Sequence, residues 1–175
     1  MKFITKEKFE NRINHLKSIN PAYDHWTDGR WAYHSLASAL AQLINPSSVL
    51  ELGTMGVKVC DFSDEMDFPI ADFWPIGSPK YLHNAKICPW PINNKSYDLF
   101  IALRVFHHLN PFQRECFLEA KRIANSIIIT LPIDYSHTNA SKILNINDFI
   151  LFNDGIPPNV FSETENEYLF GWVNI

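Results

Sequence analysis

The sequence lacks the paired cysteines that mark a disulfide framework or a zinc knuckle. Its three cysteines, Cys60, Cys88 and Cys116, are far apart in the chain and form no CxxC pair. We therefore expect reduced thiols and a cytoplasmic protein.

The sequence also lacks long runs of basic residues and long runs of apolar residues. The net charge is −4 and no basic run occurs, so we expect no nucleic-acid partner. No apolar run approaches the roughly 20 residues of a membrane-spanning helix, and the first 17 residues mix charges into their apolar positions. We expect neither a signal peptide nor a membrane partner. The G-x-S-x-G elbow, the P-loop and a Ser-His-Asp order are absent as well.

The composition is that of a globular protein. The chain has 175 residues, of which 46% are hydrophobic and 19% charged. This length suits one domain with a hydrophobic core.

Apolar periodicity predicts alternating helices and strands. Helical spacing occurs at 5–19, 31–44 and 110–124, with a weaker pattern at 138–146 and a short helix within 56–68. Apolar or β-branched runs predict strands at 49–52, 69–74, 80–87, 97–103 and 126–132. Two last runs, 148–152 and 167–173, predict a closing antiparallel pair. The expected fold is α/β, a Rossmann-like, mostly parallel sheet with helices on both faces and a C-terminal antiparallel hairpin.

In such sheets, ligands bind beyond the carboxyl ends of the strands. The first strand is followed by Gly53 and Gly56, which allow close backbone approach and positive φ. The glycines fit a G-x-G-x-x-G fingerprint poorly, because Met55 stands at the second position. Asp72 lies 19 residues after Gly53, a spacing typical of the acid that accepts hydrogen bonds from ribose hydroxyls. The alternative is a tight-turn glycine and a surface acid.

Three segments in order carry a resemblance to a known family. They are "VLELGTMG" at 49–56, "YDLFIALRVFHHL" at 97–109 and "FLEAKRIANSIIITLP" at 117–132. Together they resemble the class I S-adenosylmethionine-dependent methyltransferases, especially those acting on small molecules. The resemblance implies S-adenosyl-L-methionine as cofactor and a small-molecule or sugar-like acceptor as partner.

The resemblance also assigns roles by position. Glu51 and Gly53 match the first-motif acid and glycine, under the methionine part of the cofactor, and Thr54 and Gly56 belong to the same loop. Asp72 matches the ribose acid, and Asn84 falls near the adenine amino group. Leu103 and Arg104 lie at the tip of the fourth strand, beside the sulfonium. This set of expected cofactor-binding residues is Glu51, Gly53, Thr54, Gly56, Asp72, Asn84, Leu103 and Arg104.

Two histidines are the candidates for a catalytic base. His108 matches the histidine of the family's "EHL" segment, and His107 takes the place of its glutamate. A histidine at a strand tip can take a proton from a substrate hydroxyl. Adjacent residues on a helix or strand point apart, so we expect no metal on this pair. A packed, structural role is the alternative for His108.

Other features allow more than one interpretation. The aromatic segment 23–33 predicts a packed lid, in which Arg30 can also pair with the cofactor carboxylate. Met55 and Val57 replace loop glycines of the family, and the first crossover is short. These departures favour a second hypothesis, a methyltransferase-like binding or regulatory module without catalysis. A nicotinamide-nucleotide enzyme is the third.

The expected organisation is a single domain, 1–175. It comprises an N-terminal helical cap (1–46), a cofactor-binding core (47–133) and a C-terminal helix with hairpin (134–175). The sequence also allows a homodimer.

Overall fold

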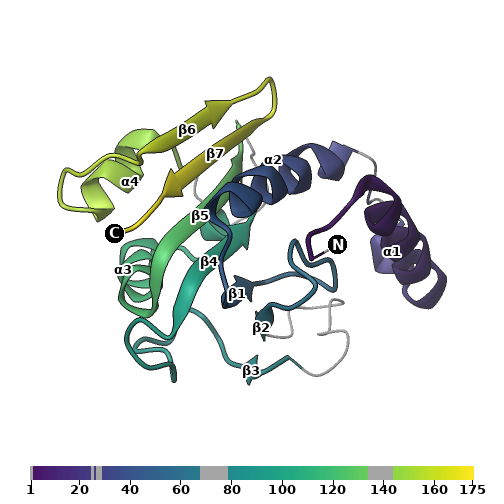
Figure 1. The fold of residues 1–175 in the computed structure, drawn as a ribbon, viewed down its shortest axis with the longest axis horizontal. Coiled ribbons are helices and arrows are strands. Elements are labelled where there is room, and N and C mark those ends of the chain that lie inside the picture. Colours follow the sequence, from purple (N-terminus) through teal and green to yellow (C-terminus); the bar gives the residue numbers. More distant parts are fainter. Residues whose placement is uncertain (1, 25, 27–28, 68–78, 134–143) are drawn as a thin grey trace.

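The computed structural model describes residues 2–24, 26, 29–67, 79–133 and 144–175, and shows one seven-stranded sheet with helices on both faces (Figure 1). The strand order is β3-β2-β1-β4-β5-β7-β6. The strands are β1 (Val49–Leu52), β2 (Asp64–Asp67), β3 (Tyr81–Leu82), β4 (Tyr97–Leu103), β5 (Ala124–Pro132), β6 (Val160–Glu163) and β7 (Glu167–Trp172). The helices are α1 (Lys6–Ile19), η1 (Pro21–Tyr23), α2 (Gly29–Ile44), η2 (Phe106–His108), α3 (Gln113–Ile123) and α4 (Ile146–Phe152).

The sheet confirms the expected fold class. Strands β1 to β5 pair in parallel, and β6 and β7 add an antiparallel hairpin beside β5. All four residues of β1 are buried, as are eight of the nine in β5, which explains their continuous apolar sequences.

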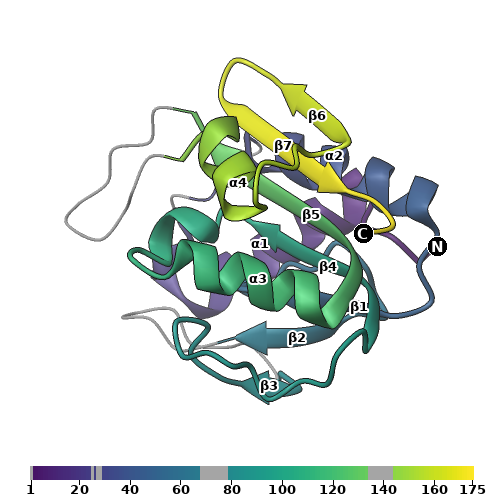
Figure 2. The ribbon, with the colours of Figure 1, turned by 90° about the vertical axis from the view of Figure 1, so that its left-hand side faces the viewer.

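Helices cover the sheet from two sides, which the side view separates. Figure 2 shows α3 and α4 in front of the sheet and α1 and α2 behind it. The front layer closes over the main core, in which Phe117, Phe149, Phe170 and Trp172 pack ring against ring. Behind the sheet, α2 buries Ala37 and Leu40 against β4 and β5.

The N-terminal helices form a separate apolar cluster with the loop that follows β1. Its centre is Phe9, Leu16 and Tyr23, and Val57 of the loop is buried in it. The backbone of Phe3 also bridges to Cys60. The N-terminal segment therefore packs directly on the candidate cofactor loop.

One sequence prediction at the C-terminus is wrong. Segment 148–152, expected to be a strand, lies in helix α4, and the hairpin is made by β6 and β7. A capping box explains the helix: the Asn145 side chain accepts from the amide of Asn147, and Asp148 accepts from the amide of Asn145. Phe149 is fully buried and Leu151 is 71% exposed, so the segment buries one side only.

The second strand also differs from the expectation. Segment 64–67 is β2, inside the stretch where a short helix was expected, and no helix lies between β1 and β2 (53–63). Its acidic side chains are tolerated because they have partners: Asp64 pairs with Lys80, and Glu65 with Lys58. The predicted strand 69–74 and most of the predicted helix 138–146 lie outside the described residues.

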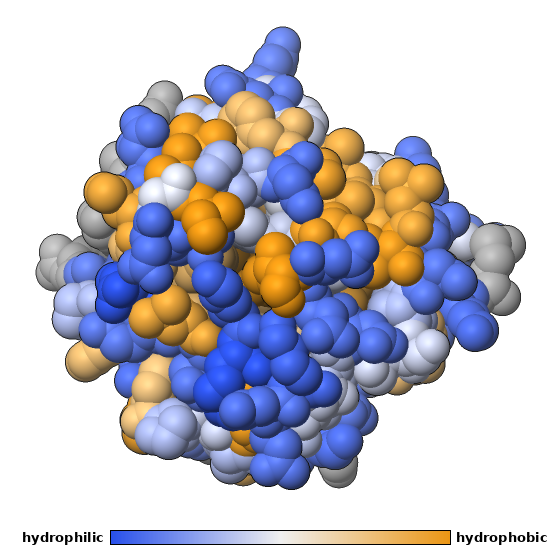
Figure 3. All heavy atoms as spheres, turned by 60° about the vertical axis from the view of Figure 1, so that its left-hand side comes forward, coloured by the Kyte–Doolittle hydropathy of each residue, from blue (hydrophilic) through white to orange (hydrophobic). Residues whose placement is uncertain are grey.

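The surface is partly apolar near the C-terminal hairpin. In Figure 3 hydrophobic residues gather mainly in the upper part, the level at which α2, β6, β7 and α4 lie in Figures 1 and 2. A groove of about 360 Å³ between α2 and this hairpin is lined by Leu43, Ile44, Val160 and Val173, among others. Within the described part of the chain, no helix is long and apolar enough to cross a membrane.

Candidate functional site

The carboxyl ends of the parallel strands define the candidate site. Because β1, β2 and β4 run in parallel, Leu52, Asp67 and Leu103 end at the same edge of the sheet. The loop 53–56 begins at the centre of this edge.

The loop after β1 has an unusual backbone. Gly53, Met55 and Gly56 all have positive φ, at 65°, 51° and 83°. The N-terminal cap holds the loop: Tyr23 donates its hydroxyl to the Met55 carbonyl at 3.1 Å, and Arg12 donates to the Gly56 carbonyl at 2.7 Å. The half-buried Met55 side chain packs against the N-terminal cluster. Met55 therefore adopts a backbone conformation with positive φ, which glycine adopts most readily.

Glu51 lies beneath the loop and is 2% exposed. Its two carboxylate oxygens accept the backbone amides of Val59 and Cys60, each at 2.8 Å. Burial raises the pKa of Glu51 to about 7, and the two amides act in the opposite direction. No helix lies in the short connection between β1 and β2 (53–63), all of which the structure describes, and the Glu51 carboxylate holds this connection through the amides of Val59 and Cys60.

Asp67 is a second candidate acid, which the apolar pattern of the sequence does not indicate. It is the last residue of β2 and is 4% exposed, and its oxygens accept the Thr54 amide at 3.0 Å and the Thr54 hydroxyl at 3.4 Å. Burial, and next the neighbouring Glu65, raises the pKa of Asp67 to about 6. A carboxylate has about four lone-pair positions, so each oxygen can accept a further donor. Asp67 thus occupies the strand tip at which the ribose acid was expected.

The observed β2 (Asp64–Asp67) ends before the run 69–74 in which the sequence predicts the second strand. The apolar run 69–74 predicts a second strand, with Asp72 as the acid near its end. Asp72 lies outside the described residues, and its cofactor role stays a prediction. The missed signal was a charged strand ending in Asp67, only 14 residues after Gly53.

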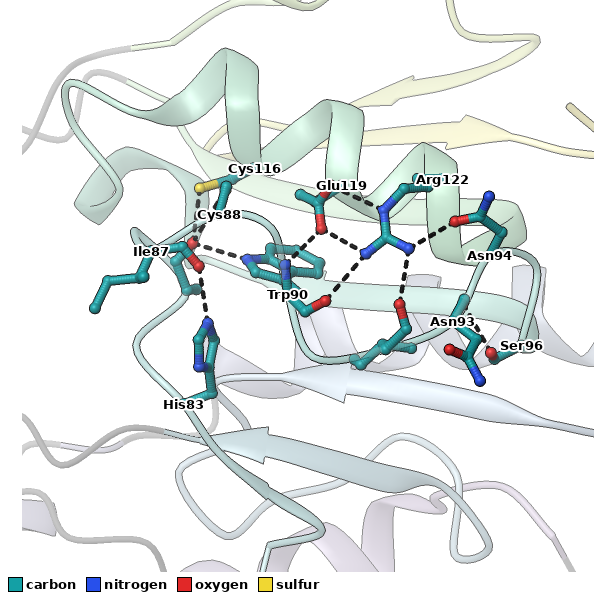
Figure 4. A network of polar contacts seen from close by, with 12 residues as sticks. His83, Ile87, Cys88, Trp90, Asn93, Asn94, Ser96, Cys116, Glu119 and Arg122 are labelled. Atoms are coloured by element: carbon teal, nitrogen blue, oxygen red, sulfur yellow. Dashed lines mark hydrogen bonds and ion pairs between the residues drawn. The ribbon is translucent and has the colours of Figure 1, made fainter.

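Asn84 follows β3, as the resemblance implies. Its side-chain oxygen accepts the Lys86 amide at 3.0 Å, which makes a local turn, and its backbone carbonyl accepts the amide of Ile87. The segment after it is fixed on α3 by Glu119 and Arg122 (Figure 4). Both oxygens of Asn84, in the side chain and in the backbone, are thus held by hydrogen bonds close to the end of β3.

Arg104 leaves the tip of β4 with φ of 55°. Two of its nitrogens donate to one oxygen of Glu167, at 2.9 and 2.6 Å, and its guanidinium lies 4.8 Å from the centre of the Tyr33 ring. Arg30 donates to the Tyr33 hydroxyl and stacks on Trp26 at 3.8 Å. Two arginines and an aromatic side chain from α2 therefore border the β4 tip, and Leu103 packs into the core behind it.

The histidine pair lies in the turn η2. His107 is buried and His108 exposed, yet their ring centres are 3.9 Å apart. The expectation that neighbouring side chains point apart does not hold in this turn. Burial, with His108 and Arg104, lowers the pKa of His107 to about 3, so His107 is a weak base at neutral pH. No group of three or more metal-binding side chains occurs among the residues that the structure describes.

The space above Gly53 tests whether a cofactor fits. A Cβ placed on Gly53 would lie 2.8 Å from a γ-carbon of Val105, so the Val105 side chain covers the glycine. Asp67 has the acceptor chemistry that a ribose needs, although it is 4% exposed and Thr54 donates to both of its oxygens. A group placed directly over Gly53 would meet the Val105 side chain unless that side chain turns away.

Comparisons with known proteins support the fold. No protein-family model matches the chain, and no curated protein matches its sequence. The chain is similar in structure to the PH0226 protein from Pyrococcus horikoshii OT3, with a TM-score of 0.59, 12% identity, and coverage of 92% of this chain and 99% of that one.

Two similar structures were determined with SAH, S-adenosylhomocysteine. For the DhpI–SAH complex the TM-score is 0.58 at 12% identity, over 93% of this chain and 94% of that one. For the N-terminal domain of EvdMO1, determined with SAH and D-fucose, it is 0.51 at 7% identity, over 79% and 80%. The chain therefore has the Rossmann-like fold of the class I S-adenosylmethionine-dependent methyltransferases.

Proposed function

We propose that the chain is an S-adenosylmethionine-dependent methyltransferase with a small-molecule acceptor. The observation that carries this proposal is the position of Asp67. A buried carboxylate ends β2 beside a positive-φ glycine that follows β1, and Thr54 joins the two. Two donors from one ribose match the acceptor positions that Asp67 retains.

Other residues have roles that follow from their positions. Asn84 would lie at the adenine end, and the backbone of Gly53, Thr54 and Gly56 would line the methionine end. Arg30, in the first turn of α2, would pair with the cofactor carboxylate. A sugar-like acceptor is one class to test, because the chain is similar in structure to EvdMO1, whose structure was determined with D-fucose.

The bound cofactor would supply an already activated methyl group. The protein then has to align the acceptor with the sulfonium and exclude water. His107 is a poor general base because of its low pKa, which leaves the exposed His108 as the candidate that can accept a proton from an acceptor hydroxyl.

A second function, a binding module without catalysis, is favoured by one observation. The Val105 side chain covers Gly53 where the methionine part would lie. Such a module would bind the nucleoside part through Asp67 and transfer no methyl group.

Titration calorimetry of the folded chain with S-adenosylhomocysteine, adenosine and NAD⁺ separates these hypotheses. The methyltransferase proposal predicts binding of S-adenosylhomocysteine more tightly than adenosine, and no tighter binding of NAD⁺. Equal affinity for S-adenosylhomocysteine and adenosine would support the second function. Preferential NAD⁺ binding would overturn both.

A further inference from the structure

Two cysteines that are distant in the sequence meet at one carbonyl. Cys88 lies in the loop between β3 and β4, and Cys116 lies in α3. Their thiols point to the carbonyl oxygen of Ala85, with sulfur–oxygen distances of 4.0 and 3.1 Å (Figure 4). The two sulfurs are therefore neighbours across the contact between the loop and the helix.

The surrounding contacts fix the loop on the helix. Glu119, one turn after Cys116, accepts the Trp90 amide at 2.6 Å. Arg122 donates to the carbonyls of Ile92 and Trp90, at 2.7 and 3.2 Å, and also pairs with Glu119 (Figure 4). The loop that carries Cys88 is thus fixed on the helix that carries Cys116.

The two thiols differ in access. Cys88 is exposed, and Cys116 is fully buried behind it. A dissolved oxidant can reach Cys88, and the mixed disulfide formed there is then within reach of Cys116. The third cysteine, Cys60, is buried in the other apolar cluster, behind the sheet.

We propose that Cys88 and Cys116 form an oxidisable dithiol that takes low-molecular-weight disulfides such as oxidised glutathione. The Cys88 thiolate attacks one sulfur of the oxidant, and one glutathione thiolate leaves. The Cys116 thiolate then attacks the Cys88 sulfur and releases the second glutathione. Two protein thiols are oxidised to one disulfide, one glutathione disulfide is reduced to two thiols, and the two protons pass to the released glutathione.

The charges around the pair set the pH dependence. Burial, followed by Glu119 and Glu115, raises the pKa of Cys88, and the hydrogen bond with Cys116 and the charge of Arg122 act in the opposite direction. Burial also raises the pKa of Cys116, with Lys86 opposing. Because the thiolate is the nucleophile, oxidation should become faster as the pH rises from about 7 to about 9.

The test treats the folded chain with oxidised glutathione and measures the intact mass and the cross-linked peptides. The wild type and Cys60→Ser should lose two hydrogens, retain no glutathione and give a peptide joining Cys88 to Cys116. Cys88→Ser should not react, and Cys116→Ser should retain one glutathione on Cys88. A wild-type chain that keeps glutathione on Cys88, or a cross-link that includes Cys60, would overturn the proposal.

Stability of the wild type gives an independent readout, which does not depend on whether a variant folds. The oxidised chain should unfold at higher urea than the reduced chain, and a reductant should reverse the shift. Failure of oxidised glutathione to react with the folded wild type, while iodoacetamide labels Cys88, would also contradict the proposal. Neither result depends on whether the chain binds S-adenosylmethionine.

Discussion

The amide of Thr54 donates to the carboxylate of Asp67 at 3.0 Å, which joins the tips of β1 and β2. Asp67 is the last residue of β2, and this contact holds its carboxylate next to the glycine loop. It also explains why the connection between the two strands can be short: the loop is tied to the strand that follows it.

Asp67→Asn should weaken S-adenosylhomocysteine binding about tenfold or more, because an amide offers fewer acceptor positions than a carboxylate and no charge. Asn keeps an oxygen for the Thr54 amide, so folding should be preserved. Calorimetry on the variant checks this, with Asp72→Asn as the matched comparison. Loss of binding in Asp72→Asn alone would contradict the assignment to Asp67.

The same carboxylate should make binding pH-dependent. The pKa of Asp67 is raised to about 6, and its protonation removes acceptor positions from the ribose. Affinity for S-adenosylhomocysteine should be highest above about pH 7 and fall about tenfold towards about pH 5. A titration at several pH values measures this; a flat profile in the wild type would contradict it.

Glu51 should give stability that declines with pH. Its pKa in the folded chain, about 7, is above the ordinary value of 4.5, so the stabilisation is complete below that ordinary value and is lost as the pH rises through about 7. The wild type should lose about 1 kcal/mol relative to Glu51→Gln between about pH 6 and about pH 8. Urea unfolding of both chains checks this.

The comparison with Glu51→Gln separates the pH dependence that Glu51 gives to the free energy of unfolding from that of groups with the opposite effect. His34 and His107 have lowered pKa values, about 4 and about 3, so their stabilisation grows with pH, mainly below pH 6.5. Both chains share this effect. Parallel stability profiles of the two chains above about pH 6 would show that Glu51 titrates normally.

Gly53→Ala should destabilise the chain by about 1–3 kcal/mol, because φ is positive and the new Cβ would meet Val105. Gly155→Ala is the matched control: its φ is 90°, but no atom lies within 4 Å of the added Cβ. It should show the backbone cost alone, about 1 kcal/mol. In urea unfolding, Gly53→Ala should destabilise a chain that already carries Val105→Ala by less than it destabilises the wild type. If the two substitutions change the free energy of unfolding additively, the contact between these residues is contradicted.

Arg122 should be important for the loop between β3 and β4. Arg122→Ala removes its bonds to the Trp90 and Ile92 carbonyls and should cost about 1–3 kcal/mol. Arg114→Ala breaks only an exposed pair with Asp154 and should cost well below 1 kcal/mol. Equal losses in urea unfolding would show that the Arg122 network adds little.

Much of the fold could be predicted from apolar periodicity. The buried strands β1, β4 and β5 and the helices α1, α2 and α3 follow runs whose burial dominates their energetics. Segment 148–152 could not be assigned by periodicity because five apolar or charged residues suit either a strand or a helix. The Asn145 capping box, a local hydrogen-bond signal, decides it.

The site was harder to predict than the fold. The positions of Gly53, Asn84 and Arg104 at strand ends follow from the strands themselves. Asp67 does not stand out in the sequence because three of the four residues of β2 are acidic and only Met66 is apolar. Met66 is buried in the main core, and Asp64 and Glu65 pair with lysines. The approach of Val105 to Gly53 joins two loops that are distant in the sequence, and no local pattern indicates it.

Calorimetric titration of S-adenosylhomocysteine into the wild type and into Val105→Ala tests the central claim most directly. One molecule should bind per chain, and Val105→Ala should bind more tightly because it uncovers Gly53. Absence of heat in both folded chains at millimolar ligand would contradict the claim that this strand edge is a cofactor site.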